Sequence, residues 1–279
     1  MAVELMEKQS IQERLRFVDD DGDDDEMRDF SVDKELPFAA RKQVELLLTI
    51  ARGFMLITGD PGSGKDLFAV STASLFKYFF GRKIILDFLP RKLFGAYTLM
   101  DAPTIVRKIK ELAKAYKVQG IEESGDPGEL SQWMEEATKK WLLEGEGYNL
   151  FHRAVYYASE LKPLAYNRNP MARTNKFIGS LGTVWRHLDL LFMGTHVYAN
   201  EIDVKAFLQY AKLRAVCTQT LEQDVFKVRV HRGMYAEAGF VVTSHKLRPV
   251  VFTINGREPR DYLGGKSFYD LYKTKHMAF

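Results

Sequence analysis

The segment GDPGSGKD, residues 59–66, carries the residue types that hold a chain of phosphates. Its glycines allow backbone angles that a Cβ atom forbids, so successive N–H groups can turn inward around an anion. The sequence predicts a buried strand over 54–58 before this loop and a helix over 67–80 after it, whose N-terminus favours negative charge. Lys65 is then expected to bridge the β- and γ-phosphates, and a glycine turn with a surface lysine is the alternative. The expected nucleotide contacts are Gly59, Asp60, Pro61, Gly62, Ser63, Gly64, Lys65, Asp66 and Leu67.

Position 66 departs from the usual phosphate-loop pattern, in which a Ser or Thr hydroxyl follows the lysine and ligates Mg2+. Asp66 places a carboxylate there instead. A hard cation accepts carboxylate oxygens, but without the metal an additional negative charge repels a triphosphate. The sequence therefore predicts the binding of phosphate more firmly than ordinary hydrolysis. ATP and Mg2+ are the expected ligands.

A nucleotide hydrolase of this kind also needs an acidic residue at the end of a second strand, to hold the metal and polarise a water molecule. The run KIILDF places Asp87 22 residues after Lys65, and AVYYASE places Ser159 and Glu160 where an Asp–Glu pair is expected. Asp66 and Ser159 look like an exchange of hydroxyl and carboxylate between two positions. We predict that Asp66 and Ser159 meet across Mg2+ and that Glu160 activates water. The alternatives are that positions 66 and 159 lost their usual residues independently, that Glu160 is only a surface residue, and that Asp87 is the strand-end acid.

The elements that must position these residues follow from hydrophobic periodicity. A strand, a glycine loop, a helix and a second strand follow one another from residue 54, and this order is typical of an α/β fold with a mostly parallel sheet. From Val225 onward the chain is richer in β-type runs. The expected helices cover 38–51, 67–80, 103–118 and 129–143, and the expected strands cover 54–58, 83–89, 154–159 and 188–196.

The composition of the chain limits the class of protein. Its 279 residues are 46% hydrophobic and 28% charged, which is typical of a globular protein. No apolar run is long enough for a membrane-spanning helix, and the first residues lack the apolar core of a signal peptide. The single cysteine, Cys217, excludes an intrachain disulfide and a zinc site of several cysteines. These observations predict a soluble protein of a reducing compartment.

Charge is distributed unevenly along the chain. Residues 1–35 hold 5 basic and 13 acidic side chains, whereas the remainder has a net charge of +11. The block DDDGDDDE at 19–26 repels itself, so a disordered acidic tail over 1–35 is predicted, followed by one domain over 36–279. An EF-hand is excluded, because the glycine at its sixth position would place Phe17 at its first. The basic body favours a polyanionic partner that the tail shields, and an ordinary lysine-rich surface with an inert tail is the alternative.

Four segments carry a family resemblance through their order and spacing. GDPGSGKD, the strand end at 155–160, RTNKFIGSLGTVWRHLDLLFMGTH at 173–196 and SFYDLYKT at 267–274 resemble the FtsK/HerA branch of P-loop ATPases, notably viral zonula-occludens-toxin-like and genome-packaging ATPases. The resemblance implies a RecA-like α/β core with a β-rich C-terminal extension. It also implies a ring, most often a hexamer, that moves double-stranded DNA. The chain departs from the family pattern at Asp66, Ser159 and His196.

The same resemblance implies roles for two further residues. Arg186, 26 residues after Glu160, fits an arginine that acts on the nucleotide of a neighbouring subunit. Arg168 and Arg173 are alternatives for that role, and a helix-end cap is the structural alternative for Arg186. His196 fits a sensor of the γ-phosphate, with a buried hydrogen-bonded histidine as the alternative.

These implications favour a viral DNA-packaging ATPase in the host cytoplasm or on the virion, with capsid vertex proteins as further partners. Relatives that export DNA through a membrane usually carry a spanning segment, which this sequence lacks, so packaging into a capsid is favoured. Movement along any DNA sequence requires contacts to phosphates rather than to base edges. A nucleotide-binding assembly protein with weak hydrolysis and a small-molecule phosphotransferase are the alternatives. The candidate DNA contacts are Arg91, Lys92, Lys205, Arg229 and Arg232.

Overall fold

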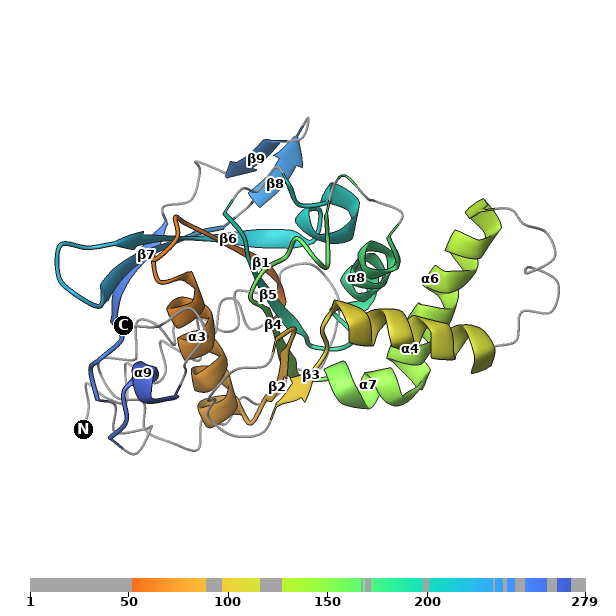
Figure 1. Ribbon diagram of the computed structural model, residues 1–279, viewed down its shortest axis with the longest axis horizontal. Coiled ribbons are helices and arrows are strands. Elements are labelled where there is room, and N and C mark those ends of the chain that lie inside the picture. The colour runs from red at the N-terminus through yellow and green to blue at the C-terminus, as the bar shows by residue number, and fades with distance from the viewer. Residues whose placement is uncertain are drawn as a thin grey trace, which may run out of the picture.

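A computed structural model shows how the predicted elements are arranged (Figure 1). The acidic segment 1–35, the expected helix 38–51, and the candidate DNA contacts Arg91 and Lys92 lie outside the residues that it describes. The described residues are 52–88, 97–115, 127–166, 168, 172–197, 201–232, 234–237, 240–243, 249–259 and 265–271.

Strands and helices alternate through the first two thirds of the described chain, and strands predominate after it. The strands are β1 (Gly53–Thr58), β2 (Lys83–Leu86), β3 (Thr98–Leu99), β4 (Ala154–Ala158), β5 (Leu191–Thr195), β6 (Ala211–Gln219), β7 (Val225–Arg232), β8 (Met234–Glu237), β9 (Phe240–Thr243) and β10 (Val250–Asn255). The helices are α3 (Lys65–Phe80), α4 (Ala102–Ala115), α6 (Pro127–Glu144), α7 (Glu146–Phe151), α8 (Arg173–Val184), the π-helix η2 (Val204–Leu208) and α9 (Phe268–Leu271).

Eight of the strands form one sheet in the order β10-β7-β6-β1-β5-β4-β2-β3. Every pair from β6 through β3 is parallel, whereas β7 and β10 extend the sheet in antiparallel fashion. Strand β5 lies between β1 and β4, so the phosphate loop and the expected acidic strand end are separated by one strand. This order is that of a RecA-like P-loop core, and the antiparallel strands are the predicted β-rich extension. The predicted fold class is confirmed.

Helices cover both faces of the parallel strands (Figure 1). Met55 and Ile57 of β1 face α3 in one hydrophobic core, while Phe54 and Leu56 face α4, α6 and α8 in a second core. This alternation is the two-residue period of a strand buried on both sides. The α4, α6 and α7 helices gather at the right of Figure 1, away from the antiparallel extension at the left.

Several strand ends differ from the sequence prediction. Strand β2 stops at Leu86 rather than 89, and β4 stops one residue before Ser159, because the Ser159 N–H donates to the Asp87 carboxylate at 2.8 Å. Strand β5 begins at Leu191 rather than 188, because Asp189 has a left-handed φ of 48° within a turn. Residues 87 and 159 lie at the carboxyl-terminal edge of the parallel strands, and Asp189 lies at their amino-terminal edge.

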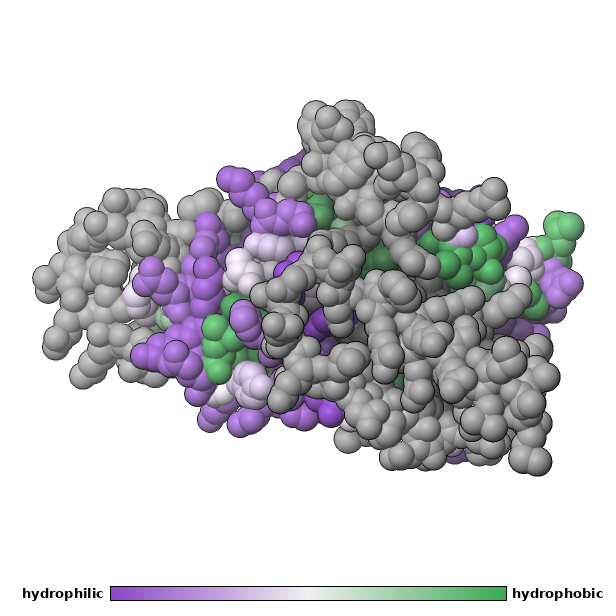
Figure 2. Space-filling view, turned by 180° about the vertical axis from the view of Figure 1, so that it is seen from behind, coloured by the Kyte–Doolittle hydropathy of each residue, from purple (hydrophilic) through white to green (hydrophobic). Residues whose placement is uncertain are grey.

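The described surface exposes few large hydrophobic side chains. Figure 2 shows green, hydrophobic areas that are separate from one another on the described part of that face. Among the helices of the described ranges, none combines the length and apolarity that crossing a membrane requires. The exposed large hydrophobic residues are Leu143, Val197, Leu221 and Val251.

Candidate nucleotide-binding site

The loop between β1 and α3 adopts the backbone conformation that its glycines make possible. Gly59, Gly62 and Gly64 have φ angles of 153°, 77° and 83°, which side-chain-bearing residues rarely adopt. The Ser63 N–H donates to the Asp60 carbonyl at 3.1 Å and closes a turn. Gly64 caps α3 in a left-handed conformation, and no side chain caps the helix by a hydrogen bond. The N-terminus of α3 therefore faces the loop as an anion-binding end.

Strands β6 and β7 pack directly against two of these glycines. A Cβ atom on Gly59 would lie 2.4 Å from the Cys217 carbonyl oxygen and from Ser63 Oγ. A Cβ atom on Gly64 would lie 2.5 Å from the Phe226 ring. Both distances are far below an ordinary contact, so neither position accepts a side chain without a shift of its surroundings. Strands β6 and β7 thus hold the loop in place.

Lys65 and Ser63 are placed as a phosphate-binding loop requires. Lys65 Nζ donates to the carbonyl oxygens of Gly59 and Asp60 at 2.7 and 2.8 Å, so its ammonium group lies over the loop. Ser63 is buried, and its Oγ has no hydrogen-bond partner among the described residues. An orphaned buried hydroxyl costs free energy, and a phosphate oxygen in the loop would satisfy it. The loop therefore fits the nucleotide phosphates that the sequence predicts.

Asp66, in the first turn of α3, is hydrogen-bonded to strand β4. The Tyr157 hydroxyl donates to Asp66 Oδ1 at 2.5 Å. Tyr157 is buried, and its ring contacts Phe88 edge-on. The hydroxyl beside the Asp66 carboxylate is therefore that of Tyr157, two residues before Ser159 on the same strand. The sequence could have indicated it, because alternate residues of a strand share one face.

The two acidic segments that the sequence offered as alternatives lie side by side. Strands β2 and β4 are parallel neighbours, and Leu86 is in register with Tyr157. Asp87 therefore reaches the end of β4, where its Oδ1 accepts the Ser159 N–H at 2.8 Å. Burial raises the pKa of Asp87 to about 6, and hydrogen bonds from Ser159 and Glu160 oppose that rise. A carboxylate thus occupies the end of β4 although residue 159 is a serine.

The oxygen-bearing groups of this edge fit Mg2+. Asp66, Asp87 and Ser159 supply the hard oxygen ligands that Mg2+ prefers, and this ion is commonly held by one or two carboxylates together with substrate phosphates and water. No group of three or more His, Cys, Asp or Glu side chains with metal-binding geometry occurs among the described residues. The site thus suits a metal that arrives with its nucleotide better than a metal bound by protein alone.

Glu160 and His196 stand at the ends of β4 and β5. Glu160 is exposed immediately after the strand end. His196 is buried, and its N–H donates to the Ile57 carbonyl at 3.0 Å. The His196 ring nitrogen Nε2 lies 3.0 Å from Glu201 Oε2, and Lys162 Nζ lies 3.5 Å from the same oxygen. His196 is thus joined to an ion pair at the nucleotide edge of the sheet.

Arg186 lies at the opposite edge of the sheet from the phosphate loop. It is exposed in the turn between α8 and β5, with its guanidinium 5.4 Å from the centre of the Trp185 ring. The Trp185 ring packs beside Gly53, the first residue of β1, whereas the loop follows the last residue of that strand. A strand of this length spans about 20 Å, so Arg186 is out of reach of the phosphates of its own subunit.

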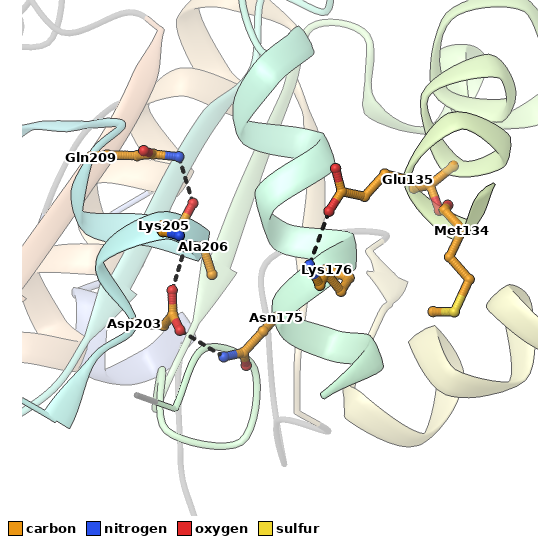
Figure 3. Close-up of polar contacts among 9 residues, drawn as sticks. Met134, Glu135, Asn175, Lys176, Asp203, Lys205, Ala206 and Gln209 are labelled. Atoms are coloured by element: carbon orange, nitrogen blue, oxygen red, sulfur yellow. Dashed lines mark hydrogen bonds and ion pairs between the residues drawn. The ribbon is translucent and has the colours of Figure 1, made fainter. Parts of the chain in front are cut away.

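Polar contacts fix α8, the helix that connects these two edges (Figure 3). Asn175 Nδ2 donates to Asp203 Oδ2 at 3.3 Å, and Lys176 Nζ pairs with Glu135 Oε1 at 3.1 Å. Arg173, at the start of α8, is exposed on the side of the sheet edge that carries the phosphate loop. Lys205 is exposed on η2, and its carbonyl accepts a hydrogen bond from Gln209.

Sequence reasoning missed three polar side chains of this edge. Tyr157 is described above, and Thr195, the last residue of β5, donates its hydroxyl to the Ser159 carbonyl. Arg214 of β6 donates from Nε to Thr58 Oγ1 at 3.2 Å, just before the phosphate loop. All three belong to strands, for which the predicted site residues were those just after the strand: Asp87, Ser159, Glu160 and His196. Strand-end position was the available signal for Thr195.

No family model and no curated protein sequence matches the chain. Solved structures similar to it include the N-terminal domain of zonular occludens toxin from Neisseria meningitidis, with a TM-score of 0.45, 15% identity, and coverage of 80% of this chain and 99% of that domain. The DNA-packaging ATPase B204 from Sulfolobus Turreted Icosahedral Virus has a TM-score of 0.37, 11% identity, and coverage of 70% and 98%. The genome packaging NTPase B204 from Sulfolobus turreted icosahedral virus 2, in complex with sulfate, has a TM-score of 0.41, 10% identity, and coverage of 71% and 98%. These proteins come from the groups that the sequence resembles.

Proposed function

We propose that this protein binds ATP at the Gly59–Asp66 loop and hydrolyses it to move double-stranded DNA, in the packaging of a viral genome into a capsid. The observation that carries the nucleotide part is the loop itself. Its left-handed glycines, the Lys65 ammonium over the loop and the orphaned Ser63 hydroxyl together form a cradle for phosphates. The DNA part is supported by the basic body of the chain and by the sequence resemblance to packaging ATPases.

Within this proposal, each residue at the nucleotide edge has its own task. Lys65 leaves the loop carbonyls and contacts the β- and γ-phosphates as a point charge. Glu160, exposed at the end of β4, orients and polarises the attacking water. His196 responds to the γ-phosphate through its position after β5, and its contact with Glu201 fixes the orientation of its ring.

Magnesium is implied by this chemistry, and the residues present fit it. The ion would be held by Asp66 and by the Ser159–Asp87 group at the end of β4, and it would neutralise charge on the β- and γ-phosphates. Tyr157 holds the Asp66 carboxylate in position through its hydroxyl. Asp87 holds the β4 end through the Ser159 N–H.

Arg186 is proposed to act on the nucleotide of a neighbouring subunit. Its position at the far edge of the sheet supports a role toward a second copy rather than its own nucleotide, and its exposure leaves it accessible to that copy. A ring of subunits, with a hexamer as the expected form, brings such an edge to the next nucleotide. The structural alternative is that Arg186 contributes only its contact with the Trp185 ring.

The experiment that tests this function is the steady-state ATPase rate with and without double-stranded DNA, with Lys65→Ala as the negative control. We expect DNA to raise the rate of the native protein and Lys65→Ala to bind no ATP. The substitution should change the unfolding free energy by only about 0.5 kcal/mol, because the side chain serves the loop rather than the core. Retained ATP affinity in Lys65→Ala contradicts the phosphate-loop assignment.

Mixed subunits extend the same assay to Arg186. Arg186→Ala and Glu160→Gln are each expected to be inactive alone, and mixed rings of the two should recover part of the activity. Some interfaces then pair an intact arginine with an intact glutamate. Absence of recovery in rings shown to contain both subunits contradicts the role across the interface.

The leading alternative is a nucleotide-binding assembly protein with weak hydrolysis. The hydrogen bond between Tyr157 and Asp66 favours it, because a carboxylate engaged by a phenol stands where a hydroxyl normally ligates the metal. ATP binding without measurable turnover, with or without DNA, identifies this alternative. DNA-independent transfer of phosphate to a small molecule identifies a phosphotransferase.

A further inference from the structure

The strands β6, β7 and β10 have two chemically different faces. On one face, Cys217, Val228 and Ile254 are buried against α3 and α9. Alternate residues point the other way, and none of them is acidic. We call this second face the outer sheet face. Its members are Arg214, Val216 and Thr218 of β6, Lys227, Arg229 and His231 of β7, and Val251, Thr253 and Asn255 of β10.

The basic residues of the outer sheet face lie in a row along β7, the middle of the three strands. Alternate residues on a strand are about 6.8 Å apart, so Lys227, Arg229 and His231 follow one another at that spacing. Lys227 is flanked in register by Thr218 on β6 and Thr253 on β10. The Lys227 and Arg229 cations, with hydroxyl groups beside Lys227, are suited to the oxygens of successive phosphates.

Three basic side chains of this face lack a counter-ion among the described residues. Arg214, Lys227 and Arg229 form no ion pair with any residue of the described ranges. By contrast, two lysines of the helical side are paired, Lys108 with Glu146 and Lys176 with Glu135. Arg229 is exposed, and Lys227 and Arg214 are partly exposed. The outer sheet face therefore presents uncompensated positive charge to solvent.

We propose that the outer sheet face binds the phosphodiester backbone of double-stranded DNA, an inference that rests on the proposed function. Charge complementarity selects a polyanion, because the face carries four basic positions and no carboxylate. The hydroxyls beside these cations fit contacts to phosphate rather than to base edges. Of the sequence-derived candidates for DNA contact, Arg229 belongs to this face, and Lys227 and Arg214 join it.

The same two strands connect this face to the nucleotide. On the opposite side of β6 and β7, the Cys217 carbonyl and the Phe226 ring pack against Gly59 and Gly64 of the phosphate loop. Arg214 also reaches Thr58, the residue before the loop. DNA bound on one face therefore lies a single strand layer from the phosphate loop on the other. This proximity offers a short physical path from DNA contact to ATP turnover.

Removal of charge from the row on β7 tests the proposal. The variant Lys227→Gln/Arg229→Gln is compared with Arg107→Gln/Lys110→Gln, which removes the same charge from exposed positions on α4 at the other end of the molecule (Figure 1). The affinity for a DNA duplex is measured by fluorescence anisotropy across a salt titration. Each lost phosphate contact lowers the slope of log K against log salt by about 0.9, so the β7 variant should lose about 1.8. Raising the salt concentration from about 50 to 200 mM should therefore weaken DNA binding by the β7 variant roughly tenfold less than it weakens DNA binding by the native protein. The α4 variant should keep the native slope.

The outcomes separate this inference from the proposed function. If the native protein binds no DNA, the proposed function fails. If the native protein binds DNA and the β7 variant keeps the native slope, the outer sheet face is not the DNA surface. Equal losses in both variants point to net charge and also overturn the proposal. A smaller oligomer with an unchanged DNA slope assigns the face to a second copy of the chain instead. Urea unfolding of both variants confirms that each is folded before binding is measured.

Discussion

At the amino-terminal edge of the parallel sheet, the buried Arg82 guanidinium meets both carboxylate oxygens of Asp189 at 3.1 Å and its backbone carbonyl at 2.8 Å. At the carboxyl-terminal edge, Ser63 Oγ has no partner among the described residues and Asp87 is buried with a raised pKa. Both edges bury polar groups, but at the second edge the hydrogen bonds to Asp87 do not offset its burial, and Ser63 Oγ has no partner in the described ranges. The first edge stabilises the fold, and the second has buried polar groups whose hydrogen bonds a ligand can complete.

The difference shows why buried charge alone does not identify a functional site. Arg82 has 1% of its side chain exposed and a pKa lowered by burial, yet Asp189 offsets that burial with good geometry. The Phe76 ring also lies 5.1 Å beneath the guanidinium. A buried group becomes a candidate for a binding site when its partner is missing, as at Ser63, or when its hydrogen bonds leave its pKa raised, as at Asp87.

The largest effect is expected at the satisfied edge. Asp189→Asn keeps an acceptor and a residue type that tolerates the left-handed backbone, but it leaves the Arg82 charge buried without its counter-ion. Breaking such a pair costs about 3–5 kcal/mol of unfolding free energy. Urea unfolding measures the loss, and calorimetry should show unchanged affinity for ATP because the phosphate loop lies at the other edge.

The control for this prediction is the double variant Arg82→Met/Asp189→Asn. It removes the unpaired charge and should recover part of the lost stability, since an uncompensated buried charge is the main cost of breaking such a pair. A folded single variant with weakened ATP binding would contradict the separation of the two edges.

The next effect is a dependence of stability on pH at the ligand edge. The folded pKa of Asp87 is raised from 3.8 to about 6, so its protonated form is favoured in the folded state. The contribution of protonated Asp87 to the free energy of unfolding is fully present below pH 3.8. It is lost as the pH rises through 6, by about 3 kcal/mol in total. Asp87→Asn carries no such charge, so the stability of the native protein should fall relative to this variant over that interval. Urea unfolding from pH 4 to 7 in magnesium-free buffer measures the difference, and a constant difference between the two proteins refutes it.

The smallest effect concerns the proposed exchange between Asp66 and Ser159. If both side chains meet on one magnesium ion, Asp66→Ser leaves two hydroxyls there and Ser159→Asp leaves two carboxylates beside the triphosphate. Each single change should lower magnesium-dependent hydrolysis, and the double change should restore it. Residues in contact usually couple by about 0.5–3 kcal/mol, so ATPase rates of the four proteins across a magnesium titration should be non-additive by that amount.

Tyr157→Phe supplies the comparison for this cycle. It removes the hydroxyl that donates to Asp66 while keeping the ring that packs on Phe88. If Asp66 couples to Tyr157 while the effects of Asp66 and Ser159 are additive, the hydroxyl that pairs with the Asp66 carboxylate is that of Tyr157. Asp87 would then become the preferred acid at the end of β4.

Much of the site could be predicted from the sequence because it is local. The phosphate loop, the strand before it and the helix after it are contiguous, and their glycine spacing, apolar run and helical period are all visible in residues 53–81. Gly81 ends α3 in a left-handed conformation, as the glycine after the predicted helix indicated. The mostly parallel sheet followed from the alternation of strands and helices.

The positions of Asp87, Tyr157 and Arg186 were decided by the tertiary structure. Asp87 and Ser159 are 72 residues apart, and they meet only because β2 and β4 pair in parallel with Leu86 opposite Tyr157. Two acidic segments that were alternatives in the sequence therefore became one cluster. Sequence spacing could not show this, because strand order and register depend on how the helices pack on both faces of the sheet.

The sequence by itself determined that the chain carries a phosphate-binding loop in an α/β core, because local backbone preferences and hydrophobic periods are sufficient for both. Only the tertiary structure decided which strands brace that loop and which cations share a face. Cys217 and Phe226 reach the loop, and Lys227 and Arg229 point away from it, through the register of β6 on β1 and of β7 on β6. A shift of one residue in that register would exchange the two faces, since side chains alternate along a strand.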